Sequence, residues 1–184
     1  MPLRLLLVRH GLSSFNKERR IQGRDDLSNL SDEGHEQARA LGRSLQEVSF
    51  HAIYSSPLQR AAATTASLLE AHAGQAADVV LDDGLLEVDL EPWSGQTIDE
   101  LIEGSPEAYS IWKKQPMKLE LQRRDGSSYK PLAELMEQAR EFISNLLQRH
   151  PVDGNETVLV VAHNAILRCL MLVLLGEPDN GFRR

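Results

Sequence analysis

Polar side chains follow four apolar segments of the chain, at the points where buried strands would end. These side chains are Arg9, His10, Arg60, Glu87 and His163. Two imidazoles, two guanidinium groups and one carboxylate suit phosphoryl transfer through a covalent histidine, because guanidinium groups bind anionic oxygens and a neutral imidazole can attack phosphorus. In the loop after His10, Gly11 would let the backbone approach an anion, and Asn16 could add a neutral donor. The pattern predicts one shared anion site.

Each titratable group in this set has an expected role. His10 would attack through one ring nitrogen, while a backbone or carboxylate acceptor holds the proton on the other nitrogen. His163 is better interpreted as a donor to the phosphoryl oxygens than as a second nucleophile. Glu87 is the candidate proton donor, because burial and a neighbouring phosphate raise the pKa of a carboxyl group. Two alternatives stay open: Glu87 could hold an arginine in place, and Arg60 could pair with a carboxylate on its own helix.

The hydrophobic pattern predicts the elements that must position these residues. Strands are predicted at 3–8, 51–55, 79–81 and 157–162. Helices are predicted from Asp32 with Ser31 as N-cap, from Ser56 as N-cap, over 132–149, and over 165–175 with Gly176 at the end. Strands that alternate with helices predict an α/β protein with a mainly parallel sheet covered on both faces. Such sheets bind ligands beyond the carboxyl ends of their strands.

The size and charge of the chain limit its class. With 184 residues, 41% of them hydrophobic, it can form one domain with a substantial core. The net charge of −7 argues against a nonspecific nucleic-acid surface, which needs clustered cations. The single cysteine, Cys169, allows no intrachain disulfide and is interpreted as a small apolar helix residue rather than a catalytic thiol. No signal peptide or membrane-spanning stretch is recognisable, so we expect a cytoplasmic protein without a membrane partner.

Five motifs give the chain a resemblance to a known family. They lie at residues 9–16, 22–23, 55–61, 86–95 and 161–164. In this order and approximate spacing they resemble the histidine phosphatase superfamily, also called the phosphoglycerate mutase-like family, over residues 5 to about 175. Within that family, residues 30–34 and 162–165 are most similar to plant and cyanobacterial proteins described as 2-carboxy-D-arabinitol-1-phosphatase-like.

The resemblance implies roles for further residues. His10 would carry the phosphoryl group, Glu87 would be the proton donor, and no metal or other cofactor would take part. The residues implied to bind the phosphoryl group are Arg9, Asn16, Arg60 and His163. The remaining residues assigned to substrate binding are Gln22, Gly23 and Asn164. The resemblance also implies a three-layer α/β/α fold.

The sequence departs from the family pattern in several places. Leu12 stands where many relatives carry an acidic or amide residue, and Asn164 replaces a more usual glycine. Glu91 and Pro92 occupy a turn where a glycine is common. Relatives generally continue past the helix that ends at Gly176 with another strand. This difference leaves open a sheet without the family's last strand, and a chain that is a fragment of a longer protein.

Two further features have competing interpretations. The pairs at 25–26 and 82–83 are adjacent aspartates that could suggest a divalent metal, but turns are the preferred interpretation. Residues 97–130 could form a lid-like insertion whose cations recognise the rest of an anionic substrate, or an ordinary exposed insertion. The cations in question are Lys113, Lys114, Lys118, Arg123 and Arg124.

The leading hypothesis is a metal-independent phosphomonoesterase that hydrolyses a small sugar phosphate or phosphorylated sugar acid through phosphohistidine. The first alternative is phosphoglycerate mutase-type phosphoryl transfer. A mutase must shield phosphohistidine from water, which favours a long closing segment and a carboxyl-terminal tail, and this short chain shows little of either. The second alternative is a catalytically silent module that binds a phosphorylated ligand. The sequence leaves the metabolite and the oligomeric state open, with a homodimer among the options.

Overall fold

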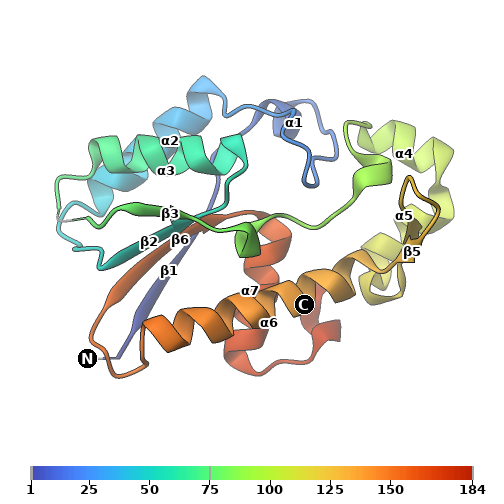
Figure 1. Ribbon diagram of the computed structural model, residues 1–184. Coiled ribbons are helices and arrows are strands. Elements are labelled where there is room, and N and C mark those ends of the chain that lie inside the picture. The colour runs from blue at the N-terminus through green and yellow to red at the C-terminus, as the bar shows by residue number, and fades with distance from the viewer. Residues whose placement is uncertain (1, 75, 184) are drawn as a thin grey trace.

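A four-stranded parallel sheet forms the centre of the computed structural model, which describes residues 2–74 and 76–183. The strands lie in the order β1 (Arg4–Arg9), β6 (Thr157–Ala162), β2 (Ala52–Ser55) and β3 (Val79–Leu81), each parallel to its neighbours (Figure 1). All four agree with the strands predicted from the hydrophobic pattern to within one residue at either end. The predicted mainly parallel sheet is therefore confirmed.

Helices cover both faces of this sheet (Figure 1). α2 (Asp32–Ser44) and α3 (Gln59–Ala71) pack together on one face, and α6 (Pro131–Arg149) and α7 (Asn164–Leu175) pack together on the other. The arrangement is the predicted three-layer α/β/α sandwich. Across residues 2–74 and 76–183, every helix is too short or too polar to cross a membrane.

The central strand β6 joins the two halves of the core. All six of its residues are buried, and successive side chains of a strand point to opposite faces. Val158 and Val160 pack in the hydrophobic cluster that includes α6 and α7, whereas Leu159 and Val161 pack in the cluster that includes α3. A parallel strand covered on both faces needs this continuous apolar run, which is why the segment is easy to recognise in the sequence.

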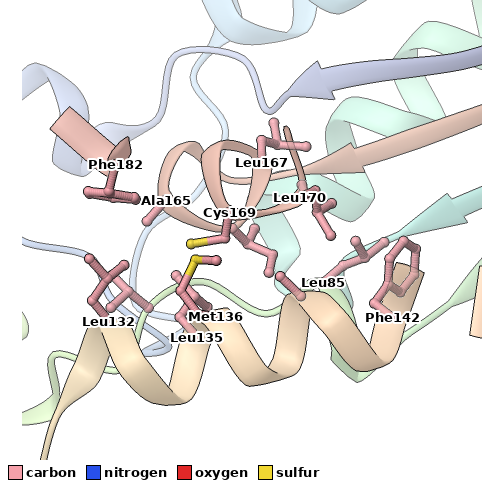
Figure 2. Packing of buried hydrophobic residues seen from close by; sticks show 14 of the residues in the cluster. Leu85, Leu132, Leu135, Met136, Phe142, Ala165, Leu167, Cys169, Leu170 and Phe182 are labelled. Atoms are coloured by element: carbon pink, nitrogen blue, oxygen red, sulfur yellow. The ribbon is translucent and has the colours of Figure 1, made fainter. Parts of the chain in front are cut away.

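The larger of the two clusters lies between α6 and α7 (Figure 2). Leu132, Leu135 and Met136 of α6 face Cys169 and Leu170 of α7, and each of these side chains is at most 1% exposed. Burial raises the pKa of the Cys169 thiol to about 12. The thiol therefore stays protonated at neutral pH, and Cys169 is the packing residue that the sequence predicts.

Residues 97–130 fold into two short helices and a hairpin near one end of α6 (Figure 1). These elements are α4 (Ile98–Gly104), α5 (Pro106–Lys114), and the antiparallel pair β4 (Leu121–Gln122) and β5 (Ser128–Tyr129). Leu101, Leu119 and Tyr129 are buried in the same cluster as α6 and α7. One side of the segment is thus part of the core, which an ordinary exposed insertion would not be.

Short helical segments connect the larger elements. They are α1 (Ser14–Lys17) and the 3₁₀ helices η1 (Asp83–Leu85), η2 (Glu91–Trp93), η3 (Pro116–Lys118) and η4 (Asp179–Arg183). Asp82 starts η1 by accepting a hydrogen bond from Gly84 N at 2.8 Å. Asp26 accepts one from Gln59 N, also at 2.8 Å, at the start of α3. The contact of Asp82 is the local one that a turn requires, whereas Asp26 binds the start of a helix 33 positions further along the chain.

The start of α3 differs from the prediction. Ser56 is not its N-cap, because the helix begins at Gln59 and Leu58 occupies the cap position without a side-chain hydrogen bond. Ser56 N donates to Val161 O at 2.9 Å, which extends the pairing of β2 with β6 by one residue. Since the backbone at Ser56 still belongs to the edge of the sheet, its side chain is placed for a contact outside α3.

Two other helix boundaries agree with the prediction. Ser31 Oγ accepts a hydrogen bond from Gly34 N at 3.1 Å at the start of α2. Gly176 adopts a φ of 65° at the end of α7, where a residue without a Cβ readily turns into the left-handed region. After α7 the described chain continues as η4, and within the described ranges β1 has a single partner strand, β6.

Candidate active site

The register of the sheet places His10 and His163 side by side. Arg9 pairs with Ala162 in the ladder between β1 and β6, and His10 N donates to Ala162 O at 2.9 Å. Each histidine directly follows its strand, so both leave the sheet at the same level. The centroids of the two rings lie 5.1 Å apart. The two imidazoles therefore share the carboxyl edge of the sheet, where parallel sheets bind ligands.

His10 has a defined tautomer. Its Nδ1 lies 2.8 Å from Gly11 O, and since a carbonyl only accepts hydrogen bonds, Nδ1 carries the proton and Nε2 holds the lone pair. Burial lowers the pKa of His10 to about 4; the charges of Arg60 and Arg9 add to this effect, and the hydrogen bond to Gly11 opposes it. At neutral pH the ring is thus an uncharged nucleophile of the kind that the sequence analysis expects.

We expect the His10 ring to titrate near pH 4 instead of near the ordinary histidine pKa of 6.5. Because the folded protein depresses this pKa, the unfolded chain binds the proton first, so the stability present above pH 6.5 is lost progressively as the pH falls from 6.5 to about 4. An NMR titration of ¹⁵N-labelled histidine measures the value, with His10→Ala for assignment. A midpoint near 6.5 would show a solvated ring.

His163 is fully buried and occupies the N-cap position of α7. Its Nε2 lies 2.8 Å from Ser56 Oγ, and its Nδ1 is buried without a hydrogen-bond partner among the described residues. Burial lowers the pKa of His163 well below 6.5, and the charges of Arg60, His10 and Arg9 add to this effect. His163 is therefore neutral at pH 7, and a neutral imidazole still offers one donor nitrogen to an anion.

The two arginines of the site differ in exposure. Arg60 is fully buried and donates to Gly23 O at 2.9 Å and to Asp25 O at 3.4 Å. Burial lowers its pKa, and the negative charge of Glu87 is the chief opposing influence. Within the described residues Arg60 has no carboxylate at ion-pair distance, so the alternative of a partner on its own helix is not supported. Arg9 is exposed at the end of β1, and its charge acts on both histidines.

Glu87 reaches the site from a loop after η1, not directly from the end of a strand as the sequence pattern suggested. Its carboxylate accepts hydrogen bonds from Val88 N at 2.9 Å and from Ala165 N and Ile166 N at 3.2 Å. The last two donors lie in the first turn of α7, beside His163. Burial raises the pKa of Glu87, while these backbone donors act in the opposite direction. A raised carboxyl pKa fits a proton donor.

Arg24 and Gln138 hold the backbone of the Glu87 loop. Arg24 Nε donates to the main-chain O of Glu87 at 2.9 Å, and its Nη2 donates to Gln138 Oε1 at 2.7 Å. Gln138 Nε2 donates to Gly84 O at 3.0 Å and to Leu86 O at 2.9 Å. An arginine thus holds the loop of Glu87, which is the reverse of the alternative in which Glu87 holds an arginine. Sequence reasoning missed both residues, because nothing in the local sequence signals that an arginine in a loop and a glutamine in the middle of a helix bind a backbone more than 50 positions away.

We expect Arg24→Met to lower kcat by about 10-fold with little change in KM, since it frees the Glu87 loop but leaves the anion-binding groups in place. Steady-state kinetics with a phosphomonoester measures the effect. Arg39→Met is the matched control, because it removes an arginine that pairs with Glu36 on the surface of α2. Equal rates for the two variants would contradict a role of Arg24 in placing Glu87.

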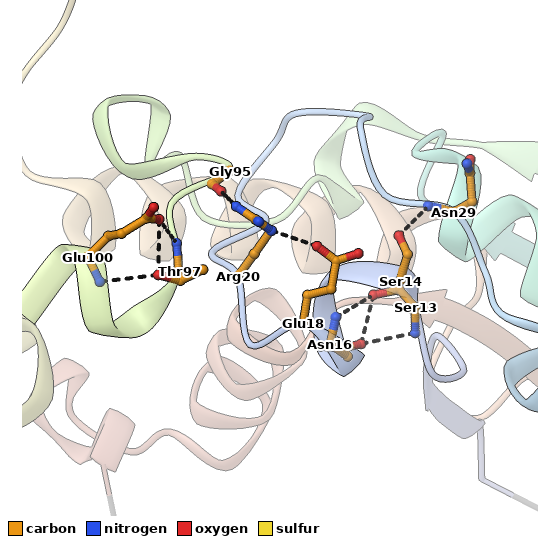
Figure 3. A network of polar contacts seen from close by, with 9 residues as sticks. All are labelled: Ser13, Ser14, Asn16, Glu18, Arg20, Asn29, Gly95, Thr97 and Glu100. Atoms are coloured by element: carbon orange, nitrogen blue, oxygen red, sulfur yellow. Dashed lines mark hydrogen bonds and ion pairs between the residues drawn. The ribbon is translucent and has the colours of Figure 1, made fainter.

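The amide side chains of Asn16 and Gln22 are anchored through their oxygen atoms. Asn16 Oδ1 accepts a hydrogen bond from Ser13 N at 3.2 Å in the capping box of α1 (Figure 3). Gln22 Oε1 accepts one from Ser28 Oγ at 2.7 Å. Each side chain is thereby oriented by its acceptor, and its NH₂ group remains as a donor. Gly23 contributes its carbonyl, which accepts from the buried arginine of the site.

Gly11 has a different role from the predicted approach to an anion. Its N–H donates to Thr64 Oγ1 at 3.0 Å, so this donor is already bonded within the protein. A Cβ at Gly11 would lie 2.6 Å from Gly34 O, so glycine permits close packing of the loop on the start of α2. Asn164, assigned to substrate by the resemblance, is the exposed first residue of α7. The described residues contain no group of three or more His, Cys, Asp or Glu placed to hold a metal ion.

Comparisons with known proteins identify the family. The family model described as Histidine phosphatase superfamily (branch 1) matches residues 5–184. Phosphoserine phosphatase 1 of Hydrogenobacter thermophilus is 35% identical over 180 residues, which cover 98% of this chain and 80% of that protein. The probable 2-carboxy-D-arabinitol-1-phosphatase of Arabidopsis thaliana is 33% identical over 180 residues, covering 98% of this chain and 35% of that protein.

A solved structure shares the fold and contains a phosphorylated ligand. It is phosphoserine phosphatase from Entamoeba histolytica in complex with 3-phosphoglyceric acid, with a TM-score of 0.76 and 26% identity over 98% of this chain and 83% of that chain. The chain therefore belongs to the histidine phosphatase superfamily. The predicted resemblance is confirmed, including the likeness to 2-carboxy-D-arabinitol-1-phosphatase. The predicted enzyme class, phosphoric monoester hydrolase, is confirmed as well, because these relatives are named phosphatases.

Proposed function

We propose that the protein hydrolyses small phosphomonoesters through a phosphohistidine at His10. The tautomer and the neutral charge of His10 are the observations that support this proposal most directly. Its proton is held on Nδ1 by Gly11 O, and burial lowers its pKa to about 4, so that Nε2 presents a lone pair at pH 7. The charges of Arg9 and Arg60 act on this ring, and they suit an incoming anion.

In the first step, Nε2 of His10 forms a bond to phosphorus while the bond between phosphorus and the alcohol oxygen breaks. Burial raises the pKa of Glu87, and in the proposed step Glu87 gives a proton to the leaving oxygen. The charge on the other three phosphoryl oxygens is stabilised by fixed donors and cations, as this reaction requires. The proposed donors are Arg9, Arg60, His163, Asn16 and Gln22. The products are a free alcohol and phosphohistidine.

In the second step, water attacks phosphohistidine. The ionised Glu87 carboxylate takes a proton from the water while the water oxygen bonds to phosphorus and the bond between phosphorus and nitrogen breaks. Inorganic phosphate leaves, His10 is again neutral, and Glu87 is again protonated. His10, Glu87 and water account for every proton and electron pair in the two steps, so the proposal requires no metal or other cofactor.

The proposed substrate is a small sugar phosphate or phosphorylated sugar acid. The names of the relatives support the acid: phosphoserine, 2-carboxy-D-arabinitol 1-phosphate and 3-phosphoglyceric acid each combine a phosphate ester with a carboxylate. A second anionic group on the substrate would require a cation outside the phosphoryl-binding set. We therefore look for that cation in residues 97–130, the predicted lid-like segment.

This segment starts beside the loop that carries Gln22. Arg20, two residues before it, donates from Nη1 to Gly95 O at 2.7 Å (Figure 3). Thr97 then starts α4 in a capping box with Glu100. This connection supports a position for the segment beside the loop that carries Gln22.

The cations of the segment are not equivalent. Arg123 pairs with Glu134 at 2.7 Å, and Arg124 pairs with Glu91. Three lysines of the segment are exposed, namely Lys113, Lys114 and Lys118. In the proposed lid, these lysines are the groups that bind the distal carboxylate or hydroxyls of the substrate.

Phosphate release from a panel of sugar phosphates and phosphorylated acids, measured in excess chelator, tests the proposed function. We expect hydrolysis of at least one phosphorylated sugar acid. Transfer of the phosphoryl group to another hydroxyl of the same substrate, without phosphate release, would instead identify a mutase. Tight binding without either reaction would identify a silent binding module.

The location and assembly of the protein stay predictions. We expect it in the cytoplasm, and a homodimer is the oligomer that we would test first. Cell fractionation and analytical ultracentrifugation are the respective measurements. The net charge of −7 supports the expectation that nucleic acid is not a partner.

A further inference from the structure

Ser56 contacts the second histidine of the site. Its Oγ lies 2.8 Å from His163 Nε2, and both side chains are 0% exposed. The contact follows from the sheet, because Ser56 directly follows β2, His163 directly follows β6, and these two strands are neighbours. Ser56 N donates to Val161 O at 2.9 Å, which fixes the backbone that carries the hydroxyl.

The direction of this hydrogen bond can be deduced from the surroundings of Ser56 Oγ. A buried hydroxyl has one hydrogen to donate, and buried polar groups are nearly always hydrogen-bonded. The other contact of Ser56 Oγ in the described residues is with Leu58 N, which donates to it at 3.4 Å. His163 Nε2 is therefore the acceptor for the hydroxyl hydrogen. A neutral imidazole that accepts at Nε2 carries its own proton on Nδ1.

We propose that Ser56 is a positioning residue that sets the tautomer of His163: its hydroxyl donates to Nε2, so that Nδ1–H donates to the phosphoryl group during transfer. The Nδ1 atom is buried and has no partner among the described residues, which points to a partner that arrives with the substrate. The inference rests on the proposed phosphoryl transfer and adds the residue that fixes one of its donors.

The two neighbouring imidazoles thereby have opposite roles, because each is hydrogen-bonded to the protein through a different ring nitrogen. Gly11 O holds the proton of His10 on Nδ1, which leaves the Nε2 lone pair for attack on phosphorus. Ser56 Oγ occupies Nε2 of His163, which leaves a donor on Nδ1. The rings are 5.1 Å apart, so a nucleophile and a donor lie next to each other while both rings stay neutral.

The experiment compares Ser56→Ala with Ser55→Ala by NMR of protein labelled with ¹⁵N-histidine. Protonated and unprotonated nitrogens of a neutral imidazole resonate far apart, so the tautomer of His163 is read directly and without substrate. Ser55 is a matched control: it is also 0% exposed, and its Oγ bonds to Thr65 Oγ1 at 2.9 Å and to Ser56 O at 3.1 Å. Ser56→Cys is a second variant that keeps the side-chain size and replaces the hydroxyl with a weak donor.

We expect His163 to carry its proton on Nδ1 in the native protein and in Ser55→Ala, and to shift toward the Nε2–H form in Ser56→Ala. The kcat of Ser56→Ala should fall by about 10- to 100-fold, with KM changed much less. This is the range found for residues that orient a functional histidine through a hydrogen bond to its other ring nitrogen. Ser56→Cys should give a smaller shift and a smaller loss. An Nε2–H tautomer in the native protein, or an unchanged tautomer or unchanged kcat in Ser56→Ala, would overturn the inference.

The NMR readout separates this inference from the proposed function. If the protein releases no phosphate from any substrate but Ser56→Ala still shifts the tautomer of His163, the hydrolase proposal fails and the hydrogen-bond assignment stands. If the native protein hydrolyses phosphomonoesters and the tautomer of His163 does not change in Ser56→Ala, the hydrolase proposal stands and the hydrogen-bond assignment fails.

Discussion

Replacing His10 with alanine is expected to lower turnover of phosphomonoesters by on the order of 10⁴-fold or more, because the variant lacks the atom that forms the covalent intermediate. In the native protein, rapid acid-free quenching with ³²P-labelled substrate should trap a phosphoenzyme that is stable in base and labile in acid, as expected for phosphohistidine. The same label should be absent from His10→Ala. Phosphate release and label retention are measured in the same samples.

A histidine elsewhere in the fold provides the control for this experiment. His35 lies in α2, and its Nδ1 lies 2.7 Å from Ser67 Oγ, a contact that involves none of the proposed site residues. His35→Ala should keep both turnover and the acid-labile label. A label that survives in His10→Ala, or an acid-stable label in the native protein, would show that another residue is the nucleophile.

Glu87→Gln is expected to have the second largest effect, and the effect should depend on the leaving group. With an alkyl phosphate, whose alkoxide needs a proton, kcat should fall by about 10²- to 10⁴-fold. With p-nitrophenyl phosphate, whose phenolate leaves without a proton, the first step should stay fast and the second should become slow. We therefore expect a burst of about one equivalent of nitrophenol per enzyme, the kinetic sign of a covalent intermediate, followed by slow turnover.

This pattern distinguishes a proton donor from a structural carboxylate. The amide that Glu87→Gln introduces keeps an oxygen that can accept from Ala165 N and Ile166 N, so the contact with α7 is preserved. A structural role would reduce the rates of both substrates alike and give no burst. Asp83→Asn is the control, because Asp83 is an exposed carboxylate of the same loop, at the start of η1.

The buried arginine of the site has no carboxylate at ion-pair distance among the described residues. Arg60 carries its charge at a fully buried position, where its direct partners are the carbonyls of Gly23 and Asp25. A buried charge that is not fully paired costs stability, and an anion bound beside it would recover part of that cost. Burial is the main cause of the lowered pKa of both histidines, and the same cations add to it, because a positive charge nearby disfavours protonation of an imidazole. Cations in this site thus serve both the binding of phosphate and the nucleophilicity of His10.

The sequence was sufficient to predict the sheet and the two histidines. Residues 157–162 form an apolar run because β6 is buried on both faces, and the apolar run at 5–8 forms the partly buried strand β1 beside it. A residue that directly follows such a strand must lie at the carboxyl edge of a parallel sheet. For this reason His10 and His163 could be assigned to one site before any coordinates were known.

The predicted N-cap at Ser56 shows where local reasoning fails. Ser followed by Pro is a good local signal for a helix start, but the hydrogen bond from Ser56 N to Val161 O keeps this residue in the sheet edge. Pairing between strands is a long-range interaction, and it overrode the local preference. The contact of Ser56 with His163, 107 positions away in the chain, follows from that pairing.

The sequence by itself determined the strands and most of the helices that carry the site, since hydrophobic periodicity and cap residues report the burial and the ends of single elements. The tertiary structure alone decided the partners: Gly11 packs on Gly34, and Arg24 binds Gln138 and the backbone of Glu87. It also decided that Glu87 rests on the first turn of α7. The physical reason is that a hydrogen bond is specified by distance and direction between groups far apart in the chain, and neither quantity leaves a periodic trace in the sequence.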